Sequence, residues 1–125
     1  MVVIRVSSVV GSWIGLWACN AAWMSEEDMA APNAELANGT LDILTCVGSS
    51  RLQLLSMFLA MGEGKHLGGG GVAMYRAKAF RLYPRPRTPS AAGLLSLDGE
   101  SVPIGPIEAR PHPSALRIMV PALTG

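Results

Sequence analysis

The sequence has little charge and no concentration of charge of one sign. Only 15% of its 125 residues are charged, the formal net charge is +1, and no run of five or more basic residues occurs. A chain this close to neutral gives no electrostatic reason to expect nucleic acid as a partner. Half of the residues are apolar, which excludes a disordered chain and favours a buried core. At this length we expect one domain and not two.

Cysteine is also scarce, since only Cys19 and Cys46 are present, in separate apolar segments. Neither belongs to a CxxC pair, and neither has a histidine at the spacing of zinc ligands, so the spacing indicates no zinc site. We interpret both residues as small buried thiols of a reducing compartment.

The N-terminal segment lacks the features of a signal peptide or an anchor. Met1–Ala22 is apolar, but it has one basic residue, Arg5, and it carries bulky Trp13 and Trp17 in its apolar part. Serine and glycine interrupt it too often for a membrane span, and it is too short for one. A short apolar run bounded by turn residues is typical of a buried strand, which we predict from Trp13 to Cys19.

The sequence is rich in residues that break regular structure, with nine prolines and fourteen glycines. Such a composition suits several short strands better than long helices. The sequence therefore predicts a mostly β domain, a β-sandwich with one helix against it (α+β). The predicted strands are Val2–Val6, Gly11–Cys19, Ala30–Leu36, Thr40–Val47, Ala73–Tyr83, Gly93–Leu97, Ile104–Arg110 and Ala115–Val120.

Turn signals separate these strands. Asn38-Gly39 lies between two apolar runs and predicts a hairpin. In the strand after it, apolar residues stand at odd and at even positions, so we expect both of its faces to be covered. The proline-rich stretch 84–89 cannot lie in a central strand and predicts an exposed loop.

One segment, Ser49 to Gly62, has helical spacing instead. Ser49 or Ser50 is a suitable N-cap, and Gly62 is a suitable end. The apolar residues cover about 200° of the circumference, well beyond the ~100° that rests on a core. Either the helix is sandwiched within the protein, or one of its sides faces an apolar ligand. The glycine-rich stretch that follows it, up to Gly71, predicts a flexible loop.

The other polar motifs have simple structural explanations. Gly68–Gly71 is no phosphate-binding loop, because no lysine followed by serine or threonine closes it. Asp98-Gly99-Glu100 predicts a tight turn, although two carboxylates are also suitable oxygen ligands for magnesium. We interpret His66 and His112 as solvated or hydrogen-bonded loop residues and not as general bases. No local grouping of serine, histidine and carboxylate indicates hydrolysis.

Several segments occur in an order that indicates one family. DMAAPNAELANGTLDIL (28–44) contains an aspartate-methionine, an Ala-Pro and an Asn-Gly-x-Leu-Asp in sequence. SRLQLLSMFLAMGEGKH (50–66), YRAKAFRL (75–82), LSLDGE (95–100) and the HP of 111–113 follow. From about Trp13 to the end, these segments resemble the sphingosine kinases, within the wider family of diacylglycerol and sphingosine lipid kinases.

The resemblance implies the C-terminal portion of a two-domain enzyme. In that family an N-terminal α/β domain carries the nucleotide loop and a Ser-Gly-Asp-Gly motif whose aspartate is the catalytic base. Residues 1–125 contain no such motif. The resemblance therefore implies that they are a partial lipid-binding β-sandwich domain without a catalytic residue, and that the N-terminal kinase domain is absent.

The resemblance also assigns site residues. The motif that contacts the phosphates of ATP and the magnesium ion is matched by Asp98, Gly99 and Glu100. The helix and lid that enclose the sphingoid tail are matched by Leu54, Met57, Phe58, Met61 and His66. Asn38-Gly39 stands where the family has Asp-Gly, which puts in doubt the structural magnesium site of bacterial relatives, and no metal ligand is assigned.

The complete enzyme is then expected to phosphorylate a sphingoid base with ATP and Mg²⁺, in the cytoplasm and in peripheral contact with intracellular membranes, while this chain alone is inactive. Its partners would be the lipid and the missing kinase domain. The alternative is a stand-alone lipid-binding or interaction module without catalysis. A third reading is a secreted β-sandwich, with Asn38-Gly39-Thr40 as its glycosylation sequon.

Overall fold

A computed structural model of the chain describes residues 7–47, 50–85 and 93–119. Within them the chain forms three small antiparallel sheets and one α-helix, which confirms the predicted mostly β architecture. The predicted strand Val2–Val6, the alternative cap Ser49 and residues 86–89 of the predicted proline-rich loop lie outside the described residues.

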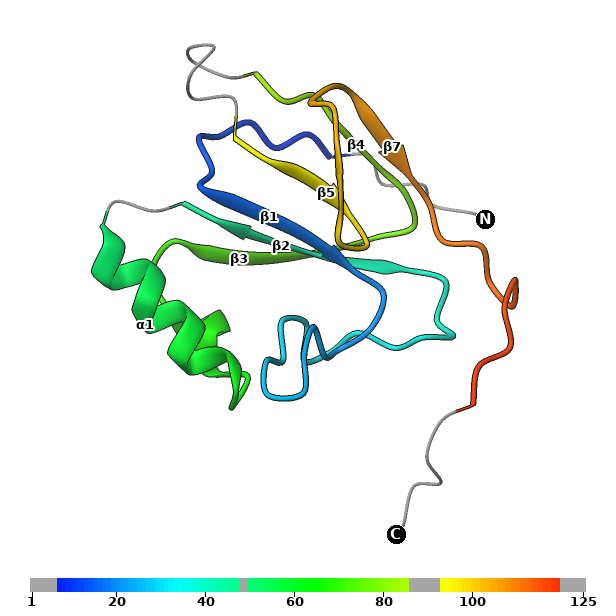
Figure 1. The fold of residues 1–125 in the computed structure, drawn as a ribbon, viewed down its shortest axis with the longest axis horizontal. Helices are drawn as coiled ribbons and strands as arrows, with labels where there is room; N and C mark the ends of the chain where they lie inside the picture. The colour runs from blue at the N-terminus through cyan, green and yellow to red at the C-terminus, as the bar shows by residue number, and fades with distance from the viewer. Residues whose placement is uncertain (1–6, 48–49, 86–92, 120–125) are drawn as a thin grey trace, which may run out of the picture.

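The largest sheet contains β1 (Gly15–Cys19), β2 (Leu41–Cys46) and β3 (Val72–Ala77), in the order β1-β2-β3 (Figure 1). β2 is antiparallel to both neighbours, so that Leu44 lies opposite Trp17 on one side and Met74 on the other. Every residue of β2 after the first is buried, which confirms that both faces of this strand are covered.

β1 begins at Gly15 and not at the predicted Gly11, and it is not fully buried. Among the described residues only β2 pairs with it, so it lies at an edge of the sheet, mostly half-buried. The strand prediction is therefore correct in place and wrong in burial. A Cβ atom on residue 15 would come within 2.4 Å of the Trp17 ring, so the glycine leaves the space that this ring occupies.

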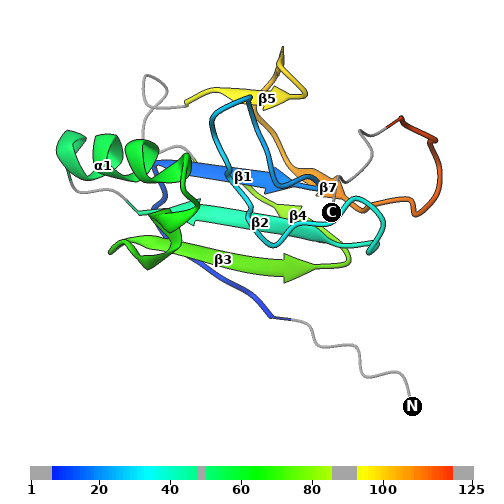
Figure 2. The ribbon, with the colours of Figure 1, turned by 90° about the horizontal axis from the view of Figure 1, so that it is seen from below.

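α1 (Arg51–Met61) packs against the sheet, as Figures 1 and 2 show from two directions. Its N-cap is Ser50, whose hydroxyl accepts a hydrogen bond from the Gln53 amide at 3.2 Å. The helix ends at Met61 with Gly62 as the C-cap, as predicted, but Gly62 keeps right-handed backbone angles. The left-handed reversal comes two residues later, at Gly64.

The buried core lies between α1 and β2. Met57 and Met61, four residues apart on one face of the helix, contact Leu44 and Cys46 of the strand. Partly buried apolar residues from β1, α1, the following segment and β3 surround this cluster: Trp17, Leu54, Leu67, Val72 and Met74. The helix is thus held to the sheet by its methionine face.

The predicted strand Ala73–Tyr83 is wrong as a single element. Lys78 and Ala79 separate β3 from β4 (Phe80–Leu82), and β4 pairs with β7 (Ile107–Ala109) in a different sheet. β5 (Leu95–Leu97) pairs with β6 (Glu100–Val102), a strand that the sequence analysis does not predict. The apolar pattern of the sequence continues through residues 78 and 79, so the break between β3 and β4 shows only in their different partner strands.

Two further predicted strands are absent from the described residues. Ala30–Leu36 forms turns, in which the Ala34 amide donates to the Ala31 carbonyl at 2.8 Å, because Pro32 has no amide proton for a ladder. Residues 115–119 also form no strand, since the chain turns at Ser114, which has a φ of 58°. The strands predicted at Gly93–Leu97 and Ile104–Arg110 are present in shortened form as β5 and β7.

The hairpin predicted at Asn38-Gly39 is wrong in its pairing. A turn is present there, with Gly39 at a φ of 69°, but the strand before it is missing. β2 pairs instead with β1, across a long connection of residues 20–40. The Met29 amide fastens this connection to the end of α1 by donating to the Met61 carbonyl at 3.2 Å.

Part of the glycine-rich stretch has regular structure, where the sequence predicts a loop. Lys65–Gly68 forms a short 3-10 helix, η1, and the Gly69 amide donates to the His66 carbonyl at 3.0 Å. Gly71 has a φ of 84°, and a Cβ atom there would come within 2.4 Å of the Val47 carbonyl oxygen. Of the four consecutive glycines, Gly71 is therefore the one whose backbone requires glycine.

In the part of the chain that the structure describes, no helix has both the length and the apolar character needed to span a bilayer.

Candidate functional site

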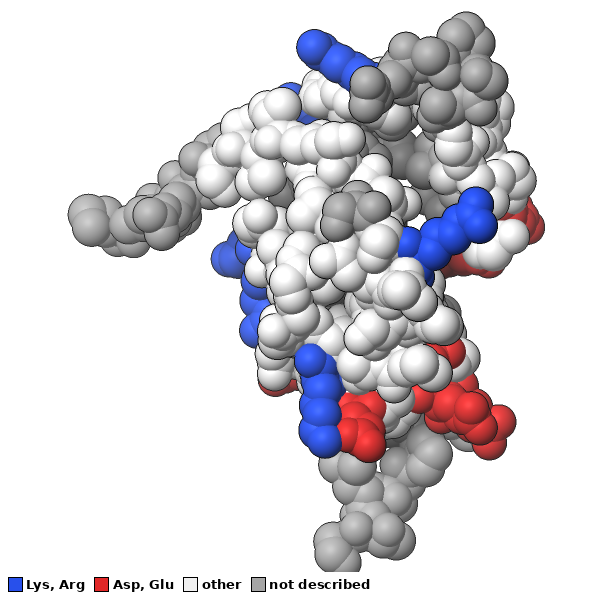
Figure 3. Space-filling model, turned by 90° about the vertical axis from the view of Figure 1, so that its left-hand side faces the viewer, with Lys and Arg blue, Asp and Glu red and all other residues white. Residues whose placement is uncertain are grey.

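α1 carries two apolar faces, and only one of them is covered. Met57 and Met61 are 5% and 0% exposed against the sheet. On the other side Leu52, Leu55 and Leu59 are 77%, 54% and 76% exposed. Figure 3, which views the molecule from the side of α1, shows a largely uncharged centre with lysines and arginines at its margins and acidic residues at the lower end and at the right-hand edge. Among the described residues, one half of the apolar arc of α1 is therefore buried in the core, and the other half is exposed to solvent.

Two of the predicted lipid-binding residues lie at the border between these faces. Leu54 is partly buried and packs on the edge of the core cluster. Phe58 is 38% exposed, and its ring meets the ring of Trp17 edge-on, with centroids 6.3 Å apart and planes at 89°. Both side chains are therefore partly accessible at the edge of the contact between α1 and the sheet.

His66, the last of the predicted lipid-binding residues, is buried in η1 and is only 1% exposed. Its Nε2 lies 3.0 Å from the Ala30 carbonyl oxygen. Because a carbonyl only accepts, Nε2 carries the proton and donates. Nδ1 has no hydrogen-bond partner among the described residues. The interpretation of His66 as hydrogen-bonded is confirmed, and the ring ties η1 to the 20–40 connection.

The acidic motif forms the turn of the β5–β6 hairpin. Asp98 and Gly99 have φ values of 48° and 89°, the left-handed pair of a two-residue type I′ turn, so the predicted tight turn is confirmed. The exposed carboxylates of Asp98 and Glu100 have no ion-pair or hydrogen-bond partner within the described ranges. In Figures 1 and 2 this turn points away from α1.

The two carboxylates do not make a complete metal site by themselves. No group of three or more histidine, cysteine, aspartate or glutamate side chains suited to a metal ion occurs in the described part of the chain. Oxygen ligands suit Mg²⁺, which is commonly held by one or two carboxylates together with phosphates and water. The turn therefore has ligands suited to share a magnesium ion with phosphates and water, but too few to enclose the ion by itself.

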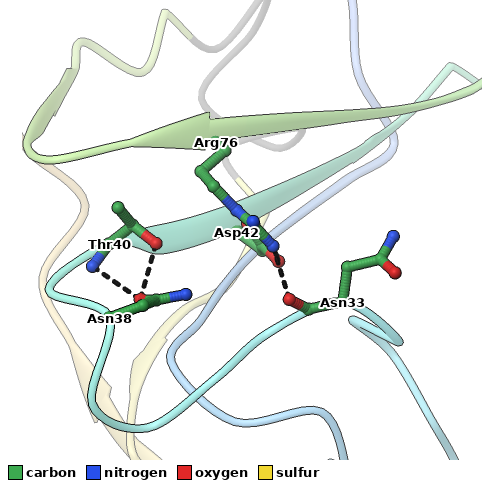
Figure 4. A network of polar contacts seen from close by, with 5 residues as sticks. All are labelled: Asn33, Asn38, Thr40, Asp42 and Arg76. Atoms are coloured by element: carbon green, nitrogen blue, oxygen red, sulfur yellow. Dashed lines mark hydrogen bonds and ion pairs between the residues drawn. The ribbon is translucent and has the colours of Figure 1, made fainter.

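The structure also brings together an ion pair that the sequence did not reveal. Asp42, which is 2% exposed in β2, accepts two hydrogen bonds from Arg76 of β3, at 2.7 Å from Nε and 2.8 Å from Nη2. Nη2 also donates to the Asn33 carbonyl (Figure 4). Its hydrogen bond and its charge attraction to Asp42 raise the pKa of Arg76. The pair closes the 20–40 connection onto the sheet.

An open cleft of about 620 Å³ lies next to this ion pair. Its lining includes the polar residues Asn33, Glu35 and Arg76 and the apolar residues Leu67 and Met74. Asp42 and Arg76 are separated by 34 residues, so no sequence spacing could have connected them. The one available signal was the single acidic residue inside the apolar run of β2.

Both cysteines are free; Cys46 is buried, as predicted, whereas Cys19 in the edge strand β1 is only partly buried. Burial and, secondarily, the charge of Asp42 raise the pKa of Cys19, and burial raises the pKa of Cys46. A raised pKa disfavours the thiolate, which is the nucleophilic form of cysteine.

The described residues thus form a β-rich domain with one helix that has a covered and an open apolar face. The model of the YegS C-terminal NAD kinase beta sandwich-like domain matches residues 4–120, and the chain belongs to this family. It is 32% identical over 92 residues to sphingosine kinase 1 of Arabidopsis thaliana and 37% identical over 106 residues to sphingosine kinase 2 of Homo sapiens. It is 35% identical over 96 residues to sphingosine kinase 1 of Mus musculus.

These similarities cover most of this chain and a small part of each relative. They span 72%, 82% and 74% of the chain, but 19%, 16% and 24% of the three kinases. The chain thus spans about a fifth of the length of these relatives. Its similarity to sphingosine kinases and its sandwich-like family confirm the resemblance found in the sequence, and identify a domain of the lipid kinase type.

Proposed function

We propose that this chain is the lipid-binding C-terminal portion of a kinase that transfers phosphate from ATP to a sphingoid base. The observation that carries the proposal is the similarity to several sphingosine kinases across most of the chain, together with Leu54 and Phe58, which remain partly accessible at the border between α1 and the sheet. Phosphoryl transfer depends on positioning and on neutralisation of charge. The chain supplies the positioning of the lipid, and the base comes from a domain that it does not contain.

The alkyl tail lies along the border between α1 and the sheet. Phe58 and Leu54 contact it first, because both are partly accessible at that border. Met57 and Met61 are covered by β2, so the tail reaches them only when α1 moves off the strand. Flexible methionine side chains can repack around an alkyl chain at low cost, which suits such an interface. His66 anchors the segment that closes the end of the site.

The acidic turn serves the nucleotide. Asp98, Gly99 and Glu100 lie at the exposed end of a hairpin, and the two carboxylates are free to bind a cation directly or through water. In the complete enzyme they help to hold the magnesium ion of Mg-ATP, while the phosphates are held by the kinase domain. This role requires the turn and the kinase domain to meet in the longer protein.

The sphingoid base is an amphiphile, so the enzyme meets it at a membrane. We place the complete protein in the cytoplasm, in peripheral contact with intracellular membranes, with the N-terminal kinase domain and the lipid as its partners. The second candidate function is a stand-alone lipid-binding or interaction module without catalysis. The open face of α1 favours it, because that face can hold a partner whether or not a kinase domain is present.

The test uses a complete kinase that carries these residues and compares neighbouring positions on α1. Phe58→Ala removes a ring at the border, and we expect a severalfold higher KM for sphingosine with an unchanged KM for ATP. Leu59→Ala is the matched control, since this residue is 76% exposed on the outer face, and we expect unchanged KM values. An unaltered sphingosine KM in Phe58→Ala would refute the lipid contact. Sphingosine binding by the chain, with no phosphorylation by the longest protein that carries it, would favour the module.

A further inference from the structure

The turn Asn38-Gly39-Thr40 has no part in the proposed lipid and nucleotide sites. It closes the 20–40 connection just before β2, and Gly39 has a φ of 69°. The Asn38 side-chain oxygen, Oδ1, accepts two hydrogen bonds from Thr40: from the amide at 2.9 Å and from the hydroxyl at 2.7 Å (Figure 4). We propose that Asn38 is a site of spontaneous deamidation, with the Gly39 amide nitrogen as the nucleophile.

The two hydrogen bonds act on the atom that gains charge in this reaction. When a nucleophile adds to the side-chain amide of asparagine, negative charge develops on Oδ1, and two donors aimed at Oδ1 stabilise it. Both donors come from Thr40, which lies in the same turn and is already in place. The geometry therefore resembles a small oxyanion hole around Asn38.

The nucleophile is held nearby by the same turn. The hydrogen bond from the Thr40 amide to Oδ1 folds the side chain of Asn38 over the peptide bond that follows it. That peptide nitrogen belongs to Gly39, which has no side chain to shield it. The turn is half-buried and not enclosed, so water has access for the second step.

The reaction needs no reagent other than water. The Gly39 nitrogen forms a bond to Cγ of Asn38, the bond from Cγ to Nδ2 breaks, and the proton lost by the Gly39 nitrogen leaves with ammonia. Water then opens the resulting succinimide at either carbonyl, which gives aspartate or isoaspartate at position 38. The formal net charge of the chain falls from +1 to 0. A carboxylate at position 38 can accept the same two hydrogen bonds from Thr40, so the aspartate product keeps the turn.

The chain provides its own controls for the experiment. Its three asparagines are Asn20, Asn33 and Asn38, and the first two are followed by alanine. The full chain is incubated at mildly alkaline pH, and the three sites are followed by peptide mass spectrometry with fragmentation that separates aspartate from isoaspartate. We expect Asn38 to convert severalfold faster than either of the other two asparagines. Equal rates at the three sites would overturn the proposal.

Two variants of Thr40 test the role of the hydroxyl. Thr40→Val removes the Oγ1 donor, and we expect the rate at Asn38 to fall about fivefold, the factor that corresponds to one neutral hydrogen bond. Thr40→Ser keeps the donor and should retain the wild-type rate. A Thr40→Val chain that remains folded and converts as fast as wild type would overturn activation by the hydroxyl. The deamidation rate at Asn38 in the wild-type chain unfolded by denaturant is the rate without the turn. If the folded wild-type chain deamidates more slowly than this unfolded chain, the turn does not assist the reaction. This comparison tests the proposal even if Thr40→Val does not fold.

Discussion

Removal of the Met61 side chain tests whether α1 is held to the sheet by its methionine face. Met61 is 0% exposed and contacts the core cluster, whereas Leu59, two residues earlier, is 76% exposed. Met61→Ala and Leu59→Ala both replace a long helix-forming residue by alanine, so their changes in helix propensity nearly cancel in the comparison. The difference in the free energy of unfolding between them therefore measures burial.

The expected magnitudes differ clearly. Truncation of a buried methionine to alanine costs about 2–5 kcal/mol, through lost transfer free energy and the cavity left behind. For a domain of this size, each kcal/mol lowers the melting temperature by about 3–5 °C, so Met61→Ala should lower it by about 6–25 °C. Leu59→Ala should change the stability by no more than about 0.5 kcal/mol.

Urea unfolding followed by circular dichroism gives both free energies, with an unchanged denaturant dependence as the check that the unfolding reaction is the same. Equal stabilities of the two variants would mean that Met61 does not pack on β2, and the division of α1 into a covered and an open face would be wrong. The border position of Phe58, on which the lipid contact depends, would then lose its support.

Three further outcomes are expected. The purified chain should consume no ATP in a sphingosine-dependent way, because it contains no Ser-Gly-Asp-Gly motif and catalytic groups that act as a unit cannot be half-supplied; turnover with contaminating kinases excluded would contradict this. In a complete kinase, Asp98→Asn or Glu100→Ala should weaken the use of Mg-ATP severalfold without lowering the melting temperature, since both side chains are exposed and asparagine tolerates the left-handed backbone of position 98; wild-type kinetics across ATP and magnesium titrations would mean that the motif is only a turn. Hydrogen bonds from Arg110 and then Arg81 lower the pKa of Glu108, so its contribution to stability is present at pH values above the ordinary carboxyl pKa and is lost as the pH falls through the lowered folded-state pKa. A titration of this carboxyl by NMR should show the lower midpoint, and a midpoint at the ordinary value would show that the arginines do not hold it.

Local sequence rules were sufficient where a short segment determines its own structure. Ser50 caps α1, Gly62 follows its last residue, and Asp98-Gly99 forms a two-residue turn, because each depends on backbone and side-chain atoms only a few residues apart. β2 was also recognisable, since its apolar residues at odd and even positions indicate a strand covered on both faces.

Predictions failed where the partner decides the structure. Ala30–Leu36 failed for a local reason instead, because its alanine, proline, asparagine and glutamate residues disfavour a strand and Pro32 is itself a signal for the turns that form there. The stretch Ala73–Tyr83 reads as one strand, but it changes from one sheet to another at Lys78. Strand pairing is a property of two segments, and a single run of residues does not contain it.

The candidate site divides in the same way. The apolar arc of α1, too wide for one supporting surface, follows from residue spacing alone, and the resemblance to sphingosine kinases selected Phe58 and Met61 within it. Residue spacing does not show that β2 covers Met61 while Phe58 lies at the border, or that Asp42 pairs with Arg76, 34 residues away; both follow from how the strands and α1 pack together. The reason is physical: periodicity fixes which residues share a face of a helix, whereas the exposure of that face depends on what distant segments pack against it.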